Sequence, residues 1–493
     1  MIAANLPALQ VVLPLLGAVV CAMVRRGPLA WGVALVVSLA MPLIAVGLLI
    51  QVLDGSTISY ALGGWRPPIG IEYRIDIVNA FILLLVSIIG AVIMPYAKAS
   101  VEAEIAPDRQ PWFYALFLLC LSGLLGMAIT GDAFNIFVFM EISSLATYAL
   151  IAMGQDRRAL LAAYQYLIMG TIGATFYVIG VGLIYTVTGT LNLADMASKV
   201  GEIENSRAII AALAFLTVGI SLKLALFPLH VWLPNAYAYA PSMVTCFLAA
   251  TATKVAVYLL LRYVFSIFGK VFVFADLPLP EIFLVLSLAA MFGASIVAVF
   301  QEDIKRMLAY SSVAQIGYIT LGIAIANKLG LTGGIVHLFN HALMKGALFM
   351  ALGAVFYRVG SVKIDDLAGL GQRMPITMGA LVLAGLSIIG VPGTVGFISK
   401  WYLGLGALEH GWWWLVFLLV LSSLISVVYI GRIVEAVYFR PVSSAAKRAT
   451  EPPLSMLLPT LLLVASTVYF GIDTAASAGI AGRAAELLLA GLR

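Results

Sequence analysis

Charge is the scarcest property of this sequence. Lys, Arg, Asp and Glu make up only 10% of the 493 residues, against about 25% in ordinary soluble domains. Hydrophobic residues make up 63%, and the mean hydropathy is +1.08. The net charge of +5 is small and spread over loops, which argues against a nucleic-acid-binding patch. This composition excludes a soluble globular enzyme and predicts a chain that crosses a membrane many times.

Cysteine is also rare. Cys21, Cys120 and Cys246 each lie alone within an apolar run, without the spacing of a metal site. We therefore expect them to be small core residues. The sequence predicts neither a bound metal ion nor a cofactor.

Apolar runs of about 20 residues, the length of a membrane-spanning helix, recur along the whole chain. They predict an all-α polytopic membrane protein with about fourteen transmembrane helices. The predicted spans are 6–24, 30–53, 75–97, 112–130, 133–154, 160–187, 208–227, 241–265, 280–300, 306–326, 331–357, 376–403, 411–438 and 454–472. The 54–74 loop is expected to form a short extracellular hairpin. Surface helices are expected at 193–207 and after residue 472.

The distribution of Lys and Arg predicts the orientation. Loops that follow odd-numbered spans carry nearly twice as many of these residues as loops that follow even-numbered spans. Cytoplasmic loops are enriched in Lys and Arg, so the odd loops are predicted to be cytoplasmic and both termini to face outward. The expected location is the cytoplasmic (inner) membrane of a bacterium or archaeon.

Two loops resemble one another. Gly189–Met196 follows the sixth predicted span, and Gly360–Leu367 follows the eleventh. An offset of five spans places them on opposite sides of the membrane, which is typical of inverted-topology repeats. We predict N-terminal helices 1–3 with the hairpin loop in 1–111, a first repeat of helices 4–8 in 112–265, a second repeat of helices 9–13 in 266–440, and helix 14 with the tail in 441–493.

Helices 7 and 12 are predicted to be broken. Phe227-Pro228 interrupts the seventh span, and Gly390-Val391-Pro392-Gly393 interrupts the twelfth. Proline removes an intrahelical hydrogen bond, and the freed carbonyl groups can hold water or a cation. Broken helices in matching positions of two halves point to a transport site.

Five charged residues interrupt apolar runs: Glu141, Lys223, Lys254, Lys345 and Lys400. A charge at the centre of a helix in a bilayer costs at least about 2.5–3.5 kcal/mol, so such residues normally face protein or water and have a function. Glu141 and Lys223 are expected to pair, because a nearby lysine favours the charged carboxylate. The alternatives are a static salt bridge for this pair, and a Lys400 side chain that extends to the membrane interface.

His337, His341 and Lys345 are spaced i, i+4, i+8 and therefore form one stripe along a helix. Three protonatable groups on one face predict a proton relay. Packing and a metal site are the alternatives, although no third metal ligand adjoins the two histidines. His230, beside the break in the seventh span, is expected either to link Lys223 to cytoplasmic water or to bond freed backbone groups. The cluster at 302–306 is expected to be an ordinary solvated loop.

Taken together, these motifs resemble one known family. They are the Glu141 context, Lys223 followed by Phe-Pro-Leu-His-Val-Trp-Leu-Pro, Thr253–Tyr258 around Lys254, His337-x-x-Asn340-His341-x-x-x-Lys345-Gly346, and Gly-Val-Pro-Gly-x-x-Gly-Phe-x-x-Lys400. The chain resembles the antiporter-like subunits of respiratory complex I, and within that family it looks most like the D-type member of Mrp-type multisubunit sodium/proton antiporters. Asn235 stands where complex I homologues often carry an acidic residue, which favours the antiporter branch or an unusual complex.

The resemblance implies fourteen spans with spans 4–8 and 9–13 as inverted repeats. It also implies a Glu141–Lys223 pair, a central Lys254 and a terminal Lys400, joined by water. We therefore expect a proton-translocating subunit of a multisubunit monovalent cation (sodium)/proton antiporter, which is a transporter rather than an enzyme. Its expected partners are other membrane subunits, protons, sodium and lipid. The alternatives are a proton-pumping subunit of a redox-driven complex (complex I or a membrane-bound hydrogenase), an inactive scaffold subunit and a solute carrier.

Overall fold

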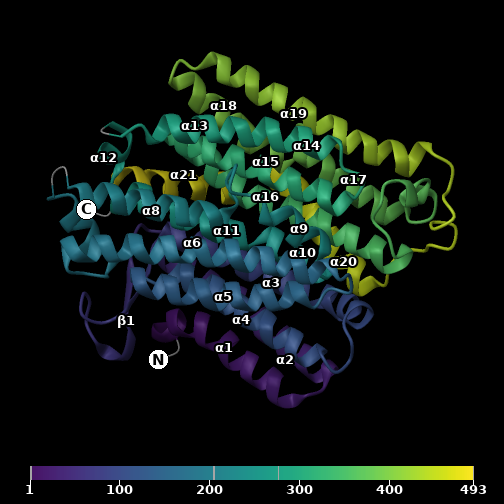
Figure 1. The fold of residues 1–493 in the computed structure, drawn as a ribbon, viewed down its shortest axis with the longest axis horizontal. Coiled ribbons are helices and arrows are strands. Elements are labelled where there is room, and N and C mark those ends of the chain that lie inside the picture. The colour runs from purple at the N-terminus through teal and green to yellow at the C-terminus, as the bar shows by residue number, and fades with distance from the viewer. Residues whose placement is uncertain (1–2, 204–205, 276, 492–493) are drawn as a thin grey trace.

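The computed structural model describes residues 3–203, 206–275 and 277–491. Figure 1 shows long helices packed side by side, most of them aligned with the long axis of the molecule. The α-helices are α1 (Leu6–Val24), α2 (Gly27–Val52), α3 (Ile77–Glu104), α4 (Gln110–Ile129), α5 (Ala133–Ala152), α6 (Arg158–Thr188), α7 (Leu193–Val200), α8 (Arg207–Leu224), α9 (Trp232–Tyr239), α10 (Ser242–Ala250), α11 (Ala252–Leu261), α12 (Lys270–Ala275), α13 (Leu279–Ala289), α14 (Ser295–Val299), α15 (Ile304–Ile325), α16 (Lys328–Val359), α17 (Pro375–Ile389), α18 (Val395–Glu409), α19 (Trp413–Val434), α20 (Leu454–Ile472) and α21 (Ala475–Ala490).

Short elements complete the fold. The 3-10 helices are η1 (Ala3–Asn5), η2 (Leu62–Gly64), η5 (Asp365–Leu367) and η6 (Leu370–Gln372), and the π-helices are η3 (Arg262–Ile267), η4 (Ala290–Ala294) and η7 (Glu435–Phe439). Strands β1 (Ile58–Ala61) and β2 (Glu72–Ile75) pair antiparallel. The predicted 54–74 hairpin is therefore present, and α7 and α21 are the two extra helices expected outside the spans.

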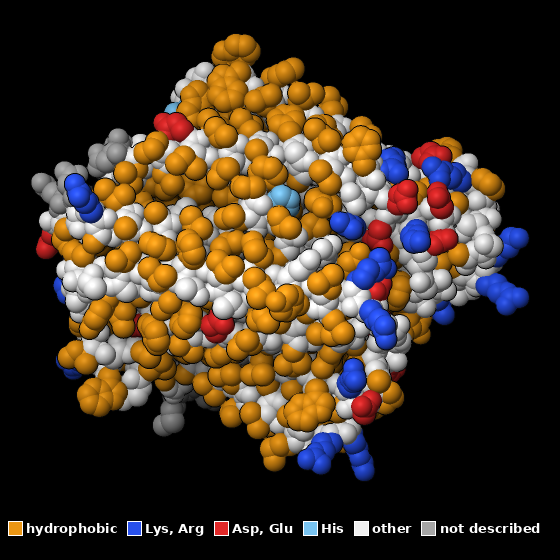
Figure 2. Space-filling model, in the orientation of Figure 1, with side chains coloured by type: hydrophobic (Ala, Val, Ile, Leu, Met, Phe, Trp, Pro, Cys, Tyr) orange, Lys and Arg blue, Asp and Glu red, His pale blue; other side chains and the backbone are white. Residues whose placement is uncertain are grey.

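The described residues contain 13 helices that are long and apolar enough to cross a membrane, or up to 14 when a bent pair counts as one span. The prediction of an all-α, multi-pass membrane protein is therefore confirmed. Figure 2 shows that hydrophobic side chains cover most of the visible face between its two ends. Charged side chains gather at the right-hand end. Such a surface suits contact with lipid, and the charged end suits contact with water.

Small residues let the helices of the first half approach closely. A Cβ atom added to Gly219 in α8 would lie 2.6 Å from the carbonyl oxygen of Gly173 in α6. Glycine at such contacts brings helix backbones together, as is common in membrane proteins. This contact fixes α8, which carries Lys223, against α6.

The two loops that resemble one another make the same backbone contacts. The N–H group of Ala133 donates to the carbonyl of Leu191 at 2.8 Å, and that of Ile304 donates to Val362 at 3.0 Å. The same number of residues separates the two donors as separates the two acceptors. The loops at 189–196 and 360–367 therefore occupy corresponding places in two halves of the chain, as inverted repeats require.

The two helices that these loops contact, α5 and α15, also begin in the same way. Asp132 accepts a hydrogen bond from Asn135 N at 2.7 Å at the start of α5, and Asp303 accepts one from Arg306 N at 2.9 Å at the start of α15. Burial raises the pKa of both carboxyl groups. Each half thus begins the corresponding helix with a partly buried aspartate cap.

Both predicted helix breaks are present. Helix α8 ends at Leu224, where Ala225 has a left-handed φ of 60°, and α9 continues this span from Trp232. Helix α17 ends before Gly390, whose φ is +91°, and α18 begins at Val395. A third irregularity was not predicted. Thr251, with φ −127° and ψ −57°, separates α10 from α11 three residues before Lys254.

Candidate functional site

Lys223 lies at the end of α8, where the helix breaks. Its ammonium group is 4.0 Å from a Glu141 carboxylate oxygen and donates a hydrogen bond to Ser144 Oγ at 2.6 Å. Both acceptors belong to α5, so the seventh and fifth spans meet at this cation. The Lys223 side chain is 7% exposed and that of Glu141 is 26% exposed. The structure therefore brings the predicted pair together, with a serine as the closer partner.

A small cavity of about 30 Å³ adjoins Lys223. Ser143, Ser144 and Thr147 of α5 line it on one side, and Ala252 and Ala256 of α11 line it on another. Its volume suits a single water molecule, and its hydroxyl groups supply polar partners. The cavity therefore lies between Lys223 and one face of α11, and Lys254 is not among its lining residues.

Lys254 is fully buried. Its Nζ donates to the carbonyl oxygen of Ala249 and, at 3.3 Å, to Thr253 Oγ1. The irregular Thr251 backbone interrupts the helix between Ala249 and Lys254, so the Ala249 carbonyl can accept from a side chain. Lys254 also interacts electrostatically with Lys345. The helix irregularity that the sequence did not reveal thus holds the central lysine.

Lys345 lies in α16 and is also fully buried. It donates to the Leu308 carbonyl at 2.8 Å and to Ser311 Oγ at 3.0 Å, both in α15. Ser311 in turn lies 2.9 Å from the Tyr429 hydroxyl of α19. The lysine is therefore joined to a chain of hydroxyl groups that runs toward the outer helices of the second half.

The two histidines of the predicted stripe are both fully buried, and their rings lie nearly parallel with centroids 6.2 Å apart. His337 Nδ1 lies 2.7 Å from Ser399 Oγ, and its Nε2 lies 3.0 Å from Gln315 Oε1. In the described part of the chain, neither ring nitrogen of His341 has a hydrogen-bond partner. Buried polar atoms without partners are rare and often mark functional sites. This arrangement favours a relay over packing, and occupied nitrogens on His337 argue against a metal ligand.

Lys400 reaches back to the break in the twelfth span. Its Nζ donates to the carbonyl groups of Ile388 and Ile389 at 3.0 and 2.8 Å, and to Ser423 Oγ at 2.9 Å. These carbonyls close the C-terminal end of α17, where the helix dipole attracts a cation. The ammonium also lies 4.8 Å from the centroid of the Tyr318 ring. Lys400 therefore points into the helix break rather than to the membrane interface.

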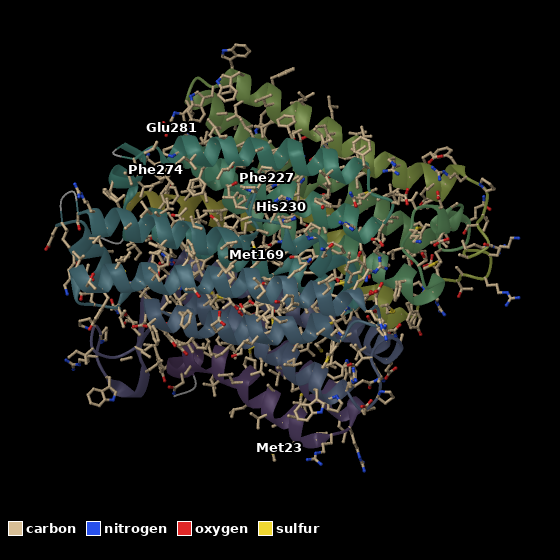
Figure 3. All side chains as sticks on the ribbon, in the orientation of Figure 1. Met23, Met169, Phe227, His230, Phe274 and Glu281 are labelled. Carbon is tan, nitrogen blue, oxygen red and sulfur yellow. The ribbon has the colours of Figure 1, made fainter. Side chains whose placement is uncertain are left out.

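His230 lies beside the break in the seventh span, but far from the charged end of the molecule that is predicted to be cytoplasmic. Figure 3 shows it beside Phe227, midway along the molecule. Its ring stacks on Phe227 with centroids 5.1 Å apart and meets Tyr310 edge-on at 6.3 Å. The expectation placed the end of the seventh span at this break, whereas α9 continues the span beyond it. The aromatic contacts of His230 therefore point toward α15 rather than toward cytoplasmic water.

The 302–306 cluster is only partly the solvated loop that was expected. Glu302 is exposed, but Lys305 is 4% exposed and donates to Ser242 Oγ at 3.1 Å. The run of opposite charges in the sequence suggested a surface turn. Helix α15 begins within the cluster, and its first turn carries Lys305 inward.

Several polar residues that line the site were not identified from the sequence. Ser311, Gln315 and Tyr318 lie on α15 at spacings of four and three residues, all buried. The Tyr318 hydroxyl donates to Ser422 Oγ at 2.9 Å. Polar residues at helical spacing inside an apolar span were the available signal.

The chain is similar to known proteins over most of its length. Residues 130–426 match the family described as NADH:quinone oxidoreductase/Mrp antiporter, transmembrane. The N subunit of NADH-quinone oxidoreductase from Desulforudis audaxviator is 44% identical over 487 residues, covering 95% of this chain and 96% of that protein. The D subunit of the Na(+)/H(+) antiporter from Alkalihalophilus pseudofirmus is 30% identical over 432 residues, covering 87% and 86%.

A solved structure is similar throughout. One chain of the Mrp complex from Dietzia sp. superposes with a TM-score of 0.89 at 27% sequence identity, covering 99% of this chain and 98% of that one. The matched range, residues 130–426, includes both helix breaks and Lys223, Lys254, Lys345 and Lys400. The chain belongs to the NADH:quinone oxidoreductase/Mrp antiporter family of transmembrane subunits.

Proposed function

We propose that this chain is a proton-translocating subunit of a multisubunit sodium/proton antiporter. The observation that carries the proposal is the series of buried ionisable groups across both halves. It runs from Glu141 and Lys223 through Lys254 to the His337, His341 and Lys345 stripe and ends at Lys400. Glu141 lies 4.0 Å from Lys223, Lys254 interacts electrostatically with Lys345, and His337 contacts Ser399, the residue before Lys400.

The manner in which the lysines are held supports proton transfer. Lys254, Lys345 and Lys400 donate to backbone carbonyls and serine or threonine hydroxyls. Among the described residues, only Lys223 of these four has a carboxylate within 4.0 Å. A lysine without a fixed counter-ion can lose its proton in a low-dielectric interior more readily than one in an ion pair. The surroundings of these lysines therefore fit reversible protonation better than a structural role in a network of salt bridges.

Coupling follows from electrostatics. Two unit charges about 10 Å apart interact by roughly 1.7 kcal/mol at an effective dielectric constant of about 20, which is more than a tenfold change in a proton equilibrium. Protonation of one lysine therefore favours release from its neighbour, and the sites titrate together. Proton loading at one end of the series can drive release at the other without covalent chemistry.

The proposed setting is a bacterial or archaeal cytoplasmic membrane. The odd loops face the cytoplasm and both termini face outward, as the Lys and Arg distribution predicts. Helices 4–8 and 9–13 form the two inverted repeats, and other membrane subunits complete the complex. The similarity to a D-type Na(+)/H(+) antiporter chain supports sodium as the exchanged cation.

A redox-driven host complex is the second candidate. It is favoured by the 44% identity to the N subunit of an NADH-quinone oxidoreductase, which exceeds the 30% identity to the antiporter chain. In that case electron transfer on partner subunits would drive the same proton series. Asn235, which donates to Gln165 at 2.9 Å, stands where the resemblance to complex I subunits often implies an acidic residue.

Purification of the complex from its native membrane tests both candidates. Mass spectrometry identifies the partner subunits, and reconstitution into liposomes allows proton movement to be followed with a pH-sensitive dye. An antiporter predicts proton flux driven by a sodium gradient alone. Flux that requires an electron donor and acceptor would instead establish the redox-driven complex, and no flux under either condition would leave an inactive scaffold.

A further inference from the structure

The odd-loop end of the molecule contains a cavity of about 420 Å³ that the proton series does not include. Its walls come from the ends of α3, α9 and α16, from the loop after α5, and from the starts of α6 and α15. Residues of both signs line it, among them Glu104, Arg158, Asp303, Lys305 and Lys363. A second cavity of about 320 Å³ shares Arg158, Asp303 and Lys363 with it. This is a charged opening at the end predicted to be cytoplasmic.

Three polar groups meet at the inner wall of this cavity. Glu104 Oε2 accepts from the backbone N–H of Ser242 at 2.9 Å, and the Ser242 hydroxyl accepts from Lys305 Nζ at 3.1 Å. Glu104 Oε1 accepts from Ser100 Oγ at 3.0 Å. Lys305 is further held over the Phe356 ring, 5.2 Å from its centroid. The carboxylate therefore faces the cavity while its hydrogen bonds lead inward.

A polar stripe continues from this point toward the centre. Tyr96, Ser100 and Glu104 lie on α3 at intervals of four residues, so they share one helix face. Tyr96 is fully buried and interacts electrostatically with Glu104. Its hydroxyl donates to the Met350 carbonyl of α16 at 3.1 Å. Met350 is five residues from Lys345, which corresponds to roughly 7.5 Å along a helix.

Gly353 makes room for this approach. A Cβ atom on Gly353 would lie 2.1 Å from the Tyr96 hydroxyl oxygen and 2.9 Å from the Ser242 Cβ. Tyr96 and Ser242 therefore both pack against α16 at Gly353. The polar stripe on α3 and the Lys305–Ser242 contact therefore meet near Gly353. Gly353 lies about two helical turns from Lys345 along α16.

We propose that this cavity is the mouth of a proton half-channel that leads to Lys345 through Glu104, Ser100, Ser242 and Tyr96. Glu104 accepts the proton from water in the cavity, the hydroxyl groups of Ser100, Ser242 and Tyr96 line the way inward, and bridging water carries the proton over the remaining distance to Lys345. Lys305 is a positioning residue, because it orients the Ser242 hydroxyl and balances the carboxylate charges at the mouth. This proposal rests on the proposed function and adds the side and the route of proton entry.

Two conservative substitutions test the route. Glu104→Gln keeps the size of the side chain but removes the charge, and Tyr96→Phe removes only a hydroxyl group. Each is expected to slow proton uptake by about three- to tenfold, the effect of losing one hydrogen bond or proton-transfer partner. Glu102→Gln, an exposed glutamate on the same helix, and Tyr114→Phe, a buried tyrosine outside the stripe, are the matched controls and should keep the full rate.

A blocking experiment tests the mouth without altering the buried route. Lys363→Cys places a thiol at the exposed rim, and a bulky membrane-impermeant thiol reagent should then stop transport only when added on the odd-loop side. Arg373→Cys, exposed on the same side but away from the cavity, is the control. The three native cysteines are buried and should not react.

The outcomes separate this inference from the proposed function. If Lys254→Met abolishes transport while Glu104→Gln, Tyr96→Phe and the labelled Lys363→Cys protein all transport at the full rate, the half-channel is wrong and the proposed function stands. If Lys254→Met also transports at the full rate, the proposed function itself is wrong. Slowed uptake in both conservative variants, together with block from the odd-loop side, supports the route.

Discussion

The Lys223 ammonium group lies closer to Ser144 than to the carboxylate of Glu141, at 2.6 Å against 4.0 Å. The lysine therefore sits between two partners, one of which is neutral and one ionisable. A tight ion pair would hold its proton firmly, whereas a longer contact leaves room for exchange with the adjoining cavity. This geometry explains how a paired lysine can still take part in proton transfer.

Removal of the Glu141 charge should stop this exchange. Glu141→Gln is expected to lower transport by roughly tenfold or more, since the loss of a charge partner worth about 1.4 kcal/mol changes an equilibrium tenfold. Proton flux in liposomes that contain the assembled complex measures the effect. Glu409→Gln, an exposed glutamate, is the control. Unchanged flux in Glu141→Gln would show that the carboxylate only supports packing.

Gly170 should be intolerant of even a methyl group. A Cβ atom there would lie 2.0 Å from the Tyr148 hydroxyl and 3.4 Å from Lys223 Nζ. Gly170→Ala is therefore expected to lower the free energy of unfolding by about 1–3 kcal/mol and to disturb Lys223. Gly182→Ala, on the same helix with open space around it, should be neutral or slightly stabilising. Thermal unfolding of the purified protein compares the two, and equal stability would contradict the crowding at Gly170.

Substitutions of His337 and His341 should differ in their effect on stability. His341→Leu should slow transport without lowering the melting temperature, because its ring nitrogens have no partners among the described residues. His337→Leu should also cost about 1–3 kcal/mol of stability, because Ser399 and Gln315 lose a buried partner. Parallel measurements of flux and thermal unfolding check both statements. Normal transport in His341→Leu would favour a packing role for the stripe.

A buried ion pair ties the N-terminal helices to the first half. Arg262 in η3 bonds Asp76 at the start of α3, and both side chains are no more than 6% exposed. Asp76→Asn should lower stability by about 3–5 kcal/mol, because it leaves the guanidinium charge buried and unpaired. Glu486→Gln, which breaks an exposed contact to Lys328, should have no measurable effect. If Asp76→Asn unfolds at the same temperature as the parent protein, the pair contributes nothing to the fold.

The spans and both helix breaks could be predicted from the sequence, because apolar length, Pro228 and the Gly390–Gly393 motif are local signals. The equivalence of the loops at 189–196 and 360–367 was visible as a short repeated pattern. The irregular backbone at Thr251 could not be predicted, since neither proline nor glycine marks it. It leaves the Ala249 carbonyl free to accept a hydrogen bond from Lys254.

The buried ionisable residues could also be found from the sequence, but their partners could not. Which carbonyl or hydroxyl group meets Lys345 or Lys400 depends on how α15, α18 and α19 pack together. The burial of Lys305 was missed because neighbouring charges in a sequence suggest solvent. The position of His230 was missed because Pro228 suggested the end of the seventh span, whereas the span continues after the break in the short helix α9.

The flux through a complex that carries Lys254→Met shows whether the buried lysines carry protons. Lys254 is fully buried between the two halves of the series, and methionine replaces it with a neutral side chain of similar length. Assembly is checked by co-purification of the partner subunits, and Lys447→Met, at an exposed position, is the control. We predict that proton flux is lost in Lys254→Met and kept in the control. Full flux through a normally assembled Lys254→Met complex would show that protons do not pass through Lys254.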